Sequence, residues 1–579
     1  MKKALTGIRI SLLAALLSAT TVLVAQTQAP VERQILAQPP APVSIQVHSS
    51  QPTGPYTPIW NYFGADEPNY IYAPNGKKLL AELVRLSPVP VYFRAHNLFT
   101  SGNGEGSLKW GSTNVYSELP DGTPVYDFTL TDRIFDALTA AHVRPLVEIG
   151  FMPQALSTHP EPYRHTFPKN DIYTGWTYPP KDEVKWSKLV AAYAAHLRQR
   201  YGNQTATWLW ELWNEPDISY WHGTPAEYDQ LYDLTAAAIR SVLPQARIGG
   251  PEATGISDRS EVFLRQFLDH CAHGVNAATG GTGAPLDFIS YHPKGSPQFA
   301  DGHVVMSVGT QLRAVEHGMQ VVASYPEWKH TPIILGESDP EGCAACQGER
   351  NGYRNGPLYG VSVAEATMRT YELASKYGVT VEGAVTWAFE FEDQPAFAGF
   401  RELATNSIDK PVLNVFRLFG MLGGANPRGD LSHAAWVQTE SSGALPLADV
   451  VEHSVTAAPD INAVATRNGN EVDILLWNYH DADVPAPDVQ VHLEIDGLHG
   501  KTADAAEYRV DATHGNAYRA WQQMGSPVHP TLDQVEQLQK AGALKQSVPS
   551  HSISLSAGMA AIELTLPRQA VVLVRLQER

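Results

Sequence analysis

Short apolar runs alternate with longer amphipathic segments over residues 57–425. In one such segment Val184, Leu189, Val190 and Leu197 recur at helical spacing among charged and polar residues, which is typical of a helix with one buried face. Similar patterns predict helices at 76–87, 131–142, 182–200, 225–242, 258–273, 306–326, 361–377 and 411–422. The alternating apolar runs predict eight strands: Ile59–Phe63, Pro90–His96, Pro145–Phe151, Thr207–Pro216, Ala246–Glu252, Asp287–Pro293, Pro332–Ser338 and Gly383–Phe391.

Eight repeats of strand and helix predict an α/β fold, a (β/α)₈ TIM barrel with enlarged loops, over residues 57–425. A doubly wound open sheet is the alternative, and it would need a glycine-rich phosphate turn after its first strand. The glycines of Gly102–Gly106 follow the second strand instead and lack the GxGxxG register. This segment is therefore interpreted as a flexible loop.

The pattern changes after residue 425 to short segments in which apolar and polar residues alternate, which indicates strands exposed on one face. Residues 426–579 are predicted to form a β-sandwich accessory domain. Residues 26–56 are interpreted as a tether, in which Ser44–His48 could add a strand to the same sandwich. The predicted strands are Ile461–Ala465, Glu471–Trp477, Val489–Ile495, Glu507–Val510, Ile553–Leu555, Met559–Leu566 and Ala570–Leu576.

The first 25 residues have the pattern of a secretory signal peptide. Lys2, Lys3 and Arg9 precede or begin an apolar stretch that ends near Val24, and small residues follow it. We expect an exported protein, periplasmic or extracellular; an uncleaved N-terminal anchor is the alternative. No later segment has 18 uninterrupted apolar residues, so no membrane span is expected in the mature chain.

Acidic residues are in excess, with 60 Asp and Glu against 42 Lys and Arg and a formal net charge of −18. This balance argues against a nucleic-acid partner, which needs a basic face, and against binding to anionic lipid. The 13 Trp, 24 Tyr and 17 Phe residues are mainly expected in the core. Such a surplus also suits a site that stacks on the apolar faces of sugar rings.

The chain has three cysteines, too few for a disulfide framework. Cys343 and Cys346 have CxxC spacing, which is found in redox sites, in zinc sites and in local disulfides. A zinc site would need a second ligand pair, and none is suitably spaced. In an exported protein a disulfide that stiffens a loop is favoured, and Cys271 is expected to be buried and inert.

Two glutamates end predicted strands: Glu215 ends the fourth strand, and Glu337 ends the seventh. Chemistry in a (β/α)₈ barrel gathers at the carboxyl ends of the strands, so these side chains should face each other across the barrel mouth. Two facing carboxylates are what glycoside hydrolysis needs, one as proton donor and one as nucleophile or base. Either glutamate could instead be part of a structural ion pair.

The run Trp213-Asn214-Glu215-Pro216 resembles the fourth strand of the retaining (β/α)₈ glycosidases. The whole chain from about residue 57 resembles glycoside hydrolase family 39, which contains β-xylosidases and α-L-iduronidases. Thr386–Phe389, Gly399-Phe400 and Asp409–Pro411 are similar to the family's eighth strand and closing helix. Residues 515–527 are similar to a β-xylosidase segment and are expected to lie outside the active site.

This resemblance implies roles for individual residues. Glu215 matches the general acid/base, Glu337 the nucleophile, and Asn214 the amide that holds the hydroxyl beside the anomeric carbon. The remaining matches are to residues that contact the sugar or orient the carboxylates: Arg94, His96, Tyr291, His292 and Trp387. Trp387 is expected to be a platform under the sugar that keeps one face accessible.

The resemblance is weaker after the eighth strand, where Glu390 and Glu392 replace the usual Phe-Ser-Asp stretch. This position implies that both glutamates contact the far hydroxyls of the sugar. The implied activity is a retaining exo-glycosidase that releases β-D-xylose from plant-type saccharides. The alternative is the same mechanism on another sugar, as in an α-L-arabinofuranosidase, a β-galactosidase or a β-glucosidase.

Two other classes of protein are the alternatives. A non-catalytic carbohydrate-binding protein would usually have lost one of the two carboxylates. A metal-dependent barrel hydrolase would need more histidines at strand ends than His96 and His292. The expected partner is a carbohydrate substrate, with no metal and no cofactor. The sequence leaves open exo or endo action and the oligomeric state.

Overall fold

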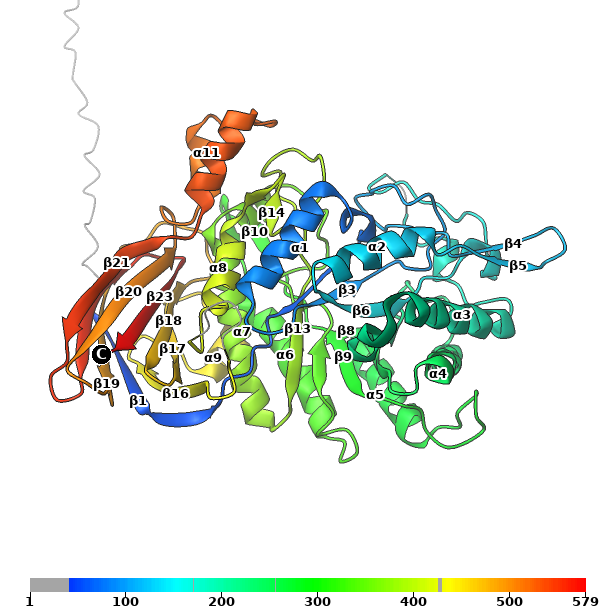
Figure 1. Ribbon diagram of the computed structural model, residues 1–579, viewed down its shortest axis with the longest axis horizontal. Coiled ribbons are helices and arrows are strands. Elements are labelled where there is room, and N and C mark those ends of the chain that lie inside the picture. The colour runs from blue at the N-terminus through cyan, green and yellow to red at the C-terminus, as the bar shows by residue number, and fades with distance from the viewer. Residues whose placement is uncertain (1–40, 170, 256, 425–429) are drawn as a thin grey trace, which may run out of the picture. The chain divides into compact units, whose positions relative to one another are not determined.

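The computed structural model describes residues 41–579 apart from residues 170, 256 and 425–429 (Figure 1). The predicted signal peptide, the first part of the tether and the predicted boundary at residue 425 lie outside the described residues. No helix in the described part of the chain combines the length and the apolar character needed to cross a membrane.

Eight parallel strands close into a barrel in the order β12-β13-β2-β3-β6-β7-β8-β9. This arrangement confirms the predicted (β/α)₈ barrel. In chain order its strands are β2 (Tyr62–Ala65), β3 (Tyr92–Ala95), β6 (Arg144–Ile149), β7 (Leu209–Leu212), β8 (Arg247–Thr254), β9 (Phe288–His292), β12 (Ile333–Leu335) and β13 (Val381–Thr386).

Eight helices follow these strands and pack around the barrel (Figure 1). Local sequence explains where they begin: Thr224 and Glu227 form a capping box with Pro225 at the first turn of α4, and Asp182 caps α3. The helices are α1 (Pro74–Leu86), α2 (Thr129–Ala140), α3 (Glu183–Tyr201), α4 (Pro225–Val242), α5 (Asp258–His273), α6 (Val308–Ala323), α7 (Pro357–Tyr377) and α8 (Pro411–Phe419).

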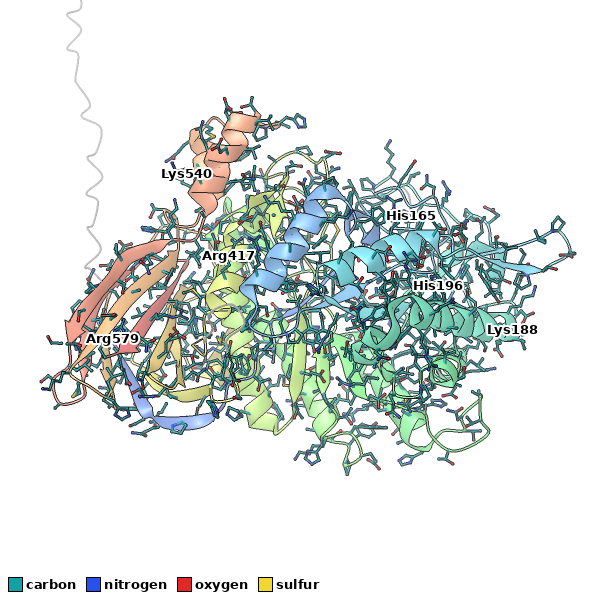
Figure 2. All side chains as sticks on the ribbon, in the orientation of Figure 1. His165, Lys188, His196, Arg417, Lys540 and Arg579 are labelled. Carbon is teal, nitrogen blue, oxygen red and sulfur yellow. A yellow bond between two sulfur atoms is a disulfide. The ribbon has the colours of Figure 1, made fainter. Side chains whose placement is uncertain are left out.

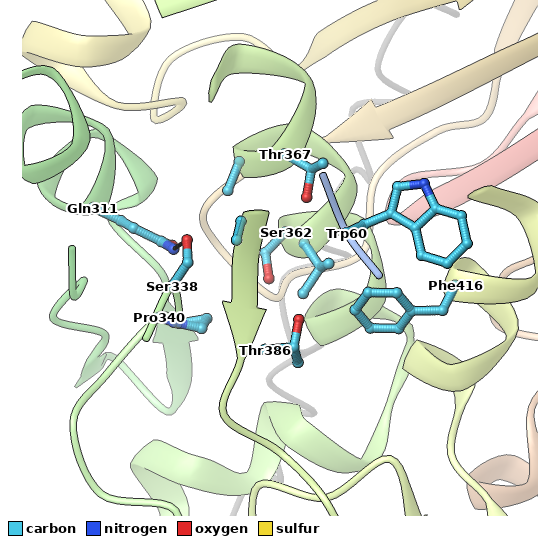
Figure 3. Close-up of a pocket in the computed structure, with 11 residues that line it drawn as sticks. Trp60, Gln311, Ser338, Pro340, Ser362, Thr367, Thr386 and Phe416 are labelled. Carbon is cyan, nitrogen blue, oxygen red and sulfur yellow. Dashed lines mark hydrogen bonds between the residues drawn. The ribbon is translucent and has the colours of Figure 1, made fainter. Parts of the chain in front are cut away.

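The barrel wall is tightly packed against its helices. A cavity of about 20 Å³ lies behind the last two barrel strands and is lined by Trp60, Thr386 and Phe416, among others (Figure 3). A volume of this size holds about one water molecule. The cavity is therefore a packing defect and is too small for a sugar.

The accessory domain is one nine-stranded sheet in the order β21-β20-β23-β18-β17-β16-β1-β19-β22. Strand β1 lies between β16, to which it is antiparallel, and β19, to which it is parallel. It is longer than the expected strand Ser44–His48. The strands are β1 (Val43–Pro55), β16 (Ala435–Ser441), β17 (Asp460–Asn468), β18 (Glu471–Tyr479), β19 (Val489–Asp496), β20 (Thr502–Val510), β21 (Gln546–Ser554), β22 (Ala560–Leu566) and β23 (Ala570–Glu578).

The sheet must fold back on itself. Strands β22 and β23 are joined by only three residues, 567–569, yet five strands lie between them in the sheet. Such a link spans at most ~14 Å, whereas six steps across a flat sheet cover ~29 Å. The two halves therefore face each other over a shared core that includes Ile45, Leu493 and Val572, which confirms the predicted β-sandwich.

Two short helices, α10 (Ala517–Gln523) and α11 (Leu532–Gly542), connect β20 to β21. Helix α11 projects from the rest of the molecule in Figure 1, and neither helix was predicted. Phe397, in the loop after the eighth barrel strand, packs on Tyr518 and Trp521 of α10. The segment at 515–527 therefore supports a loop at the barrel mouth. Smaller elements are α9 (Leu447–His453) and the pairs β4 (Tyr116–Glu118) with β5 (Pro124–Tyr126), β10 (Gln298–Ala300) with β11 (His303–Val305), and β14 (Ala404–Thr405) with β15 (Ile408–Asp409).

A buried ionic cluster joins the barrel to the sandwich. Arg369 of α7 donates to Glu365 of the same helix at 2.9 Å and to Asp460 of β17 at 2.7 Å. The indole of Trp477 donates to the other oxygen of Glu365. All four side chains are buried. An ion pair in this position holds the two domains together only while every charge keeps its partner.

The Arg369→Met variant is expected to lower the free energy of unfolding by ~3–5 kcal/mol, because Asp460 would remain buried without a counter-ion. Urea denaturation measures this loss. The control is Arg200→Met, whose ion pair with Asp136 is 41% and 48% exposed and should contribute at most ~1 kcal/mol. Equal losses in the two variants would contradict the assigned role of Arg369.

Candidate active site

The polar side chains at the carboxyl ends of the barrel strands converge on one cluster. The cluster has seven side chains, and all of them except that of Glu215 are buried in the barrel interior. The cluster contains Arg94 from β3, Glu148 from β6, Glu211 from β7, Glu215 after β7, Glu252 from β8, His292 from β9 and Glu337 after β12. The predicted pair Glu215 and Glu337 is part of it.

Glu215 and Glu337 face each other closely. One carboxylate oxygen of each lies within 4.8 Å of the other, and their side chains are 14% and 5% exposed. Glu215 has a φ of +47°, which non-glycine residues rarely adopt. Its amide donates to the carbonyl of Glu252 at 2.9 Å, and this bond supports the strained turn that brings the carboxylate into the barrel.

Arg94 is the centre of the cluster and is completely buried. Its guanidinium donates to Glu211 at 2.5 Å, to Glu337 at 3.1 Å and to the Oδ1 atom of Asn214 at 3.1 Å. It also lies 2.8 Å from Glu148. Because Asn214 accepts through its oxygen, its amide NH₂ group is the part left to donate to a ligand. Arg94 therefore orients residues from three strands at once.

Lys294, two residues after β9, was missed by the sequence analysis. Its Nζ atom lies 2.5 Å from Glu337 and 3.3 Å from Asp339. Burial alone would raise the pKa of Glu337, but Lys294, His292 and Arg94 lower that pKa well below its usual value. Glu337 is therefore ionised at neutral pH. A cation two residues past a strand-end histidine was the available signal for Lys294.

His292 is clamped between two carboxylates. Its Nδ1 atom lies 3.0 Å from Glu215, and its Nε2 atom lies 2.6 Å from Glu252. Burial alone would lower the pKa of His292, but Glu337, Glu215 and Glu252 raise it to about 9. The imidazole is therefore charged at neutral pH and donates from both nitrogens.

His96 lies beside this cluster in the neutral form, because burial and then the charge of Arg94 lower its pKa well below the usual value. Asn97 donates to its Nδ1 atom at 2.7 Å, so the ring proton is on Nε2. That atom lies 3.2 Å from Glu148. Burial raises the pKa of Glu148 to about 8, which keeps this neighbour largely protonated at neutral pH.

The expectation that Trp387 keeps an accessible face is wrong, because the residue is 1% exposed. Its ring packs over Gly64 of β2, where a Cβ would lie 2.3 Å from the ring. Its indole NH donates to Asp66 at 2.8 Å, and the guanidinium carbon of Arg94 lies 4.9 Å from the ring centre. Trp387 is thus a buried support for Arg94 and Asp66.

Three predicted contact residues point away from the cluster. Tyr291 faces the outer helices: its hydroxyl donates to the carbonyl of Val315 at 2.8 Å, because neighbouring residues of a strand point to opposite sides. Glu390 accepts the amide of Ser407 at 2.7 Å. Burial raises the pKa of Glu392, whose backbone hydrogen-bond partner is Asn75. Glu390 and Glu392 thus contact the loop before α8 and the start of α1, not the cluster.

The loops after β3 and β6 surround a pocket of about 270 Å³. It is lined by Lys109, Trp110, Tyr163, His165 and Trp176, among others, and His165 is labelled in Figure 2. The ring of Trp110 lies 4.9 Å from that of His96, so the pocket adjoins the cluster. Aromatic walls with a few polar groups are typical of a ligand pocket.

Cys343 and Cys346 form a disulfide in the loop after Glu337, with Cα atoms 5.4 Å apart. This confirms the preferred interpretation of the CxxC pair, and Cys271 is buried as expected. Arg354 donates to the carbonyls of both cysteines, at 2.7 and 2.6 Å. The disulfide loop is therefore tied down close to the cluster.

Among the described residues, Glu215, His292 and Glu337 have donor atoms close enough together to hold a metal ion. A metal ligand must be deprotonated. His292 is charged and donates from both nitrogens, and Lys294 and Arg94 already neutralise Glu337. The chemistry of this donor set therefore suits proton transfer better than metal binding.

Two facing carboxylates at the ends of the fourth and seventh strands of a (β/α)₈ barrel define the class of barrel glycoside hydrolases. The comparison with known families agrees. The model of Glycosyl hydrolases family 39 matches residues 45–556, so the chain belongs to this family and is a glycoside hydrolase.

Individual relatives are distant. The chain is 25% identical to a beta-xylosidase of Geobacillus stearothermophilus over 507 aligned residues. This alignment covers 84% of this chain and 86% of the relative. The chain is 24% identical over 532 residues to an alpha-L-iduronidase of Mus musculus, 87% of this chain and 76% of the relative. The crystal structure of a monomeric beta-xylosidase from Caulobacter crescentus has the same fold, with a TM-score of 0.70, 23% identity and coverage of 92% and 99%.

The charged state of His292 predicts how stability depends on pH. A pKa of about 9 in the folded protein against 6.5 as the usual value means that the folded state binds the proton more tightly. This contribution is complete below pH ~6.5 and is lost as the pH rises through ~9. Urea denaturation between pH 6.5 and 9.5 should therefore show a steeper loss of stability in the parent than in His292→Asn. Identical slopes would contradict the assignment.

Proposed function

We propose that the protein is a retaining exo-glycosidase that releases terminal β-D-xylose from oligo- or polysaccharides. The observation that carries the mechanism is the separation of the Glu215 and Glu337 oxygens, which is at most 4.8 Å. Carboxyl groups ~5–5.5 Å apart are typical of retaining enzymes, whereas inverting enzymes need ~6.5–9.5 Å to admit water between them.

In the first step an oxygen of Glu337 attacks the anomeric carbon, and the bond to the leaving oxygen breaks. Glu215 donates its proton to that oxygen, so a sugar ester of Glu337 and an alcohol form. In the second step Glu215 takes a proton from water, whose oxygen attacks the same carbon and releases Glu337. The low pKa of Glu337 suits a nucleophile that must be ionised, and Asn214 has an NH₂ group free for the neighbouring hydroxyl.

Family membership and the two beta-xylosidases among the relatives support xylose as the sugar. The small exposed fractions of Glu215 and Glu337 support action on a chain end, because an enclosed site admits one terminal sugar. The signal-like N-terminus supports export, as a substrate outside the cell requires. The site needs no cofactor for this reaction, since side chains supply both the acid and the nucleophile.

The Glu337→Gln variant is expected to lose at least ~10³-fold in kcat on the aryl β-xyloside, because the covalent route is removed. The parent is first assayed on aryl β-xyloside, α-L-arabinofuranoside, β-galactoside and β-glucoside. Proton NMR of the first product should show the β-anomer. An α-anomer at early times, or unchanged turnover in the variant, would overturn the proposal. Glu382→Gln, at the opposite end of the barrel, is the matched control.

A second candidate is hydrolysis of a uronic-acid glycoside, and Lys294 is the observation that favours it. A lysine 2.5 Å from the proposed nucleophile is placed to meet a carboxylate on a sugar bound there. Four relatives are alpha-L-iduronidases, which keeps this class in consideration.

Lys294→Met separates the two candidates. If the sugar is a uronic acid, its aryl glycoside should lose ~10–100-fold more kcat/KM than the xyloside does, because a charged hydrogen bond contributes ~1.5–3 kcal/mol. Comparing two substrates cancels the effect of Lys294 on Glu337. Equal losses on the two substrates, with the xyloside cleaved faster by the parent, would reject the uronic-acid candidate.

A further inference from the structure

We infer that Glu252 is a positioning residue that controls the acid/base Glu215 through His292. This inference rests on the proposed function, since it concerns how Glu215 exchanges its proton with the substrate. No motif in the sequence marks Glu252, and the proposed two-step mechanism assigns it no role. Its carboxylate is completely buried at the end of the fifth barrel strand.

Glu252 reaches Glu215 by two routes. The side-chain route is a chain of hydrogen bonds in which His292 donates from Nε2 to Glu252 at 2.6 Å and from Nδ1 to Glu215 at 3.0 Å. The backbone route is the bond from the amide of Glu215 to the carbonyl of Glu252 at 2.9 Å. Both glutamates have positive φ, +56° at Glu252 and +47° at Glu215, which is unfavourable for a residue other than glycine. The backbone hydrogen bond between them supports both conformations.

The residue next to the nucleophile leaves room for this pair. A Cβ at Gly336 would lie 1.8 Å from the carboxylate of Glu252 and 2.9 Å from Nε2 of His292. Any larger residue before Glu337 would therefore displace the hydrogen bond. The hydrogen bond between Glu252 and His292 thus lies directly against the residue that precedes Glu337.

Glu252 orients His292 and contributes to its charge. Burial opposes the charged form of this imidazole, and the carboxylates of Glu337, Glu215 and Glu252 favour it. The nearby cations Arg94 and Lys294 pair with Glu252 and Glu337. Glu252 bonds directly to Nε2, so the ring must present Nδ1–H to one oxygen of Glu215. The other oxygen of Glu215 is then the one that carries the proton to the sugar.

A cation fixed beside Glu215 stabilises the carboxylate that forms when the proton leaves. This matters only when the leaving group needs the proton. Glu252→Gln keeps the shape of the side chain but removes one of the three carboxylate charges that keep His292 protonated. We therefore expect a loss that depends on the leaving group, together with a shift in the pH profile.

The test compares kcat/KM of the parent and Glu252→Gln on two glycosides of whichever sugar the parent cleaves. On a disaccharide, whose leaving alcohol needs a proton, the variant should lose about tenfold or more. On the 2,4-dinitrophenyl glycoside, which leaves without one, it should stay within about threefold of the parent. The alkaline limb of the disaccharide profile that follows loss of the His292 proton should also move to lower pH. Glu382→Gln is the control and should change neither ratio nor profile.

Equal losses on the two substrates would overturn the inference, because they would show a general structural effect. No loss on either would overturn it too. If Glu252→Gln unfolds at the assay temperature, Glu252→Asp replaces it. This variant keeps the charge with a shorter reach. It should keep the pH profile of the parent and lose part of kcat/KM on the disaccharide.

A second readout does not depend on activity. NMR titration of ¹³C-labelled histidine, with His292→Asn to assign the signal, should show the His292 pKa falling in Glu252→Gln relative to the parent. An unchanged titration would overturn the inference. A parent that cleaves no glycoside, with His292 still sensitive to Glu252, would instead reject the proposed function and leave the electrostatic link between the two residues intact.

Discussion

The active site depends on one buried cation. Arg94 has no contact with solvent and lies within ion-pair distance of four glutamates, each from a different barrel strand. Removing an arginine from water is costly, and only close carboxylates offset that cost. The carboxylates in turn could not be buried together without it. This mutual requirement makes the barrel interior a single electrostatic unit in which Glu337 has a fixed place.

The unit stays close to neutral by dividing its carboxylates into two kinds. Burial raises the pKa of Glu148 to about 8 and raises that of Glu211 well above its usual value, so these two are largely protonated at neutral pH. Burial opposes the charged form of Glu252 too, but Arg94 and His292 lower its pKa to about 2. Identical side chains thus differ because Glu252 and Glu337 each have a second cation beside them, His292 at 2.6 Å and Lys294 at 2.5 Å. Glu337, the proposed nucleophile, belongs to the charged kind.

The barrel, the sandwich and the pair Glu215 and Glu337 could be predicted because they follow from periodicity and from strand-end position. Those signals are local. Tyr291 was predicted wrongly because neighbouring strand residues alternate between the two faces, and sequence alone did not tell which face His292 takes. Trp387 was expected to stay accessible, but the absence of a side chain at Gly64 lets its ring sink into the barrel. Lys294, Glu148, Glu211 and Glu252 were missed because their importance comes only from contacts between strands distant in sequence.

The position of β1 has a consequence for how the chain is assembled. This first strand is hydrogen-bonded in the interior of a sheet whose other members all follow the barrel in sequence. During synthesis, β1 emerges before the barrel and must wait until the barrel and most of the accessory domain have followed. Contacts this distant in sequence form slowly, so an unpaired strand is exposed in the meantime. Strand β1 and the strands that follow the barrel thus close a loop around it, and the accessory domain cannot be separated by a single cut without removing an interior strand from its sheet.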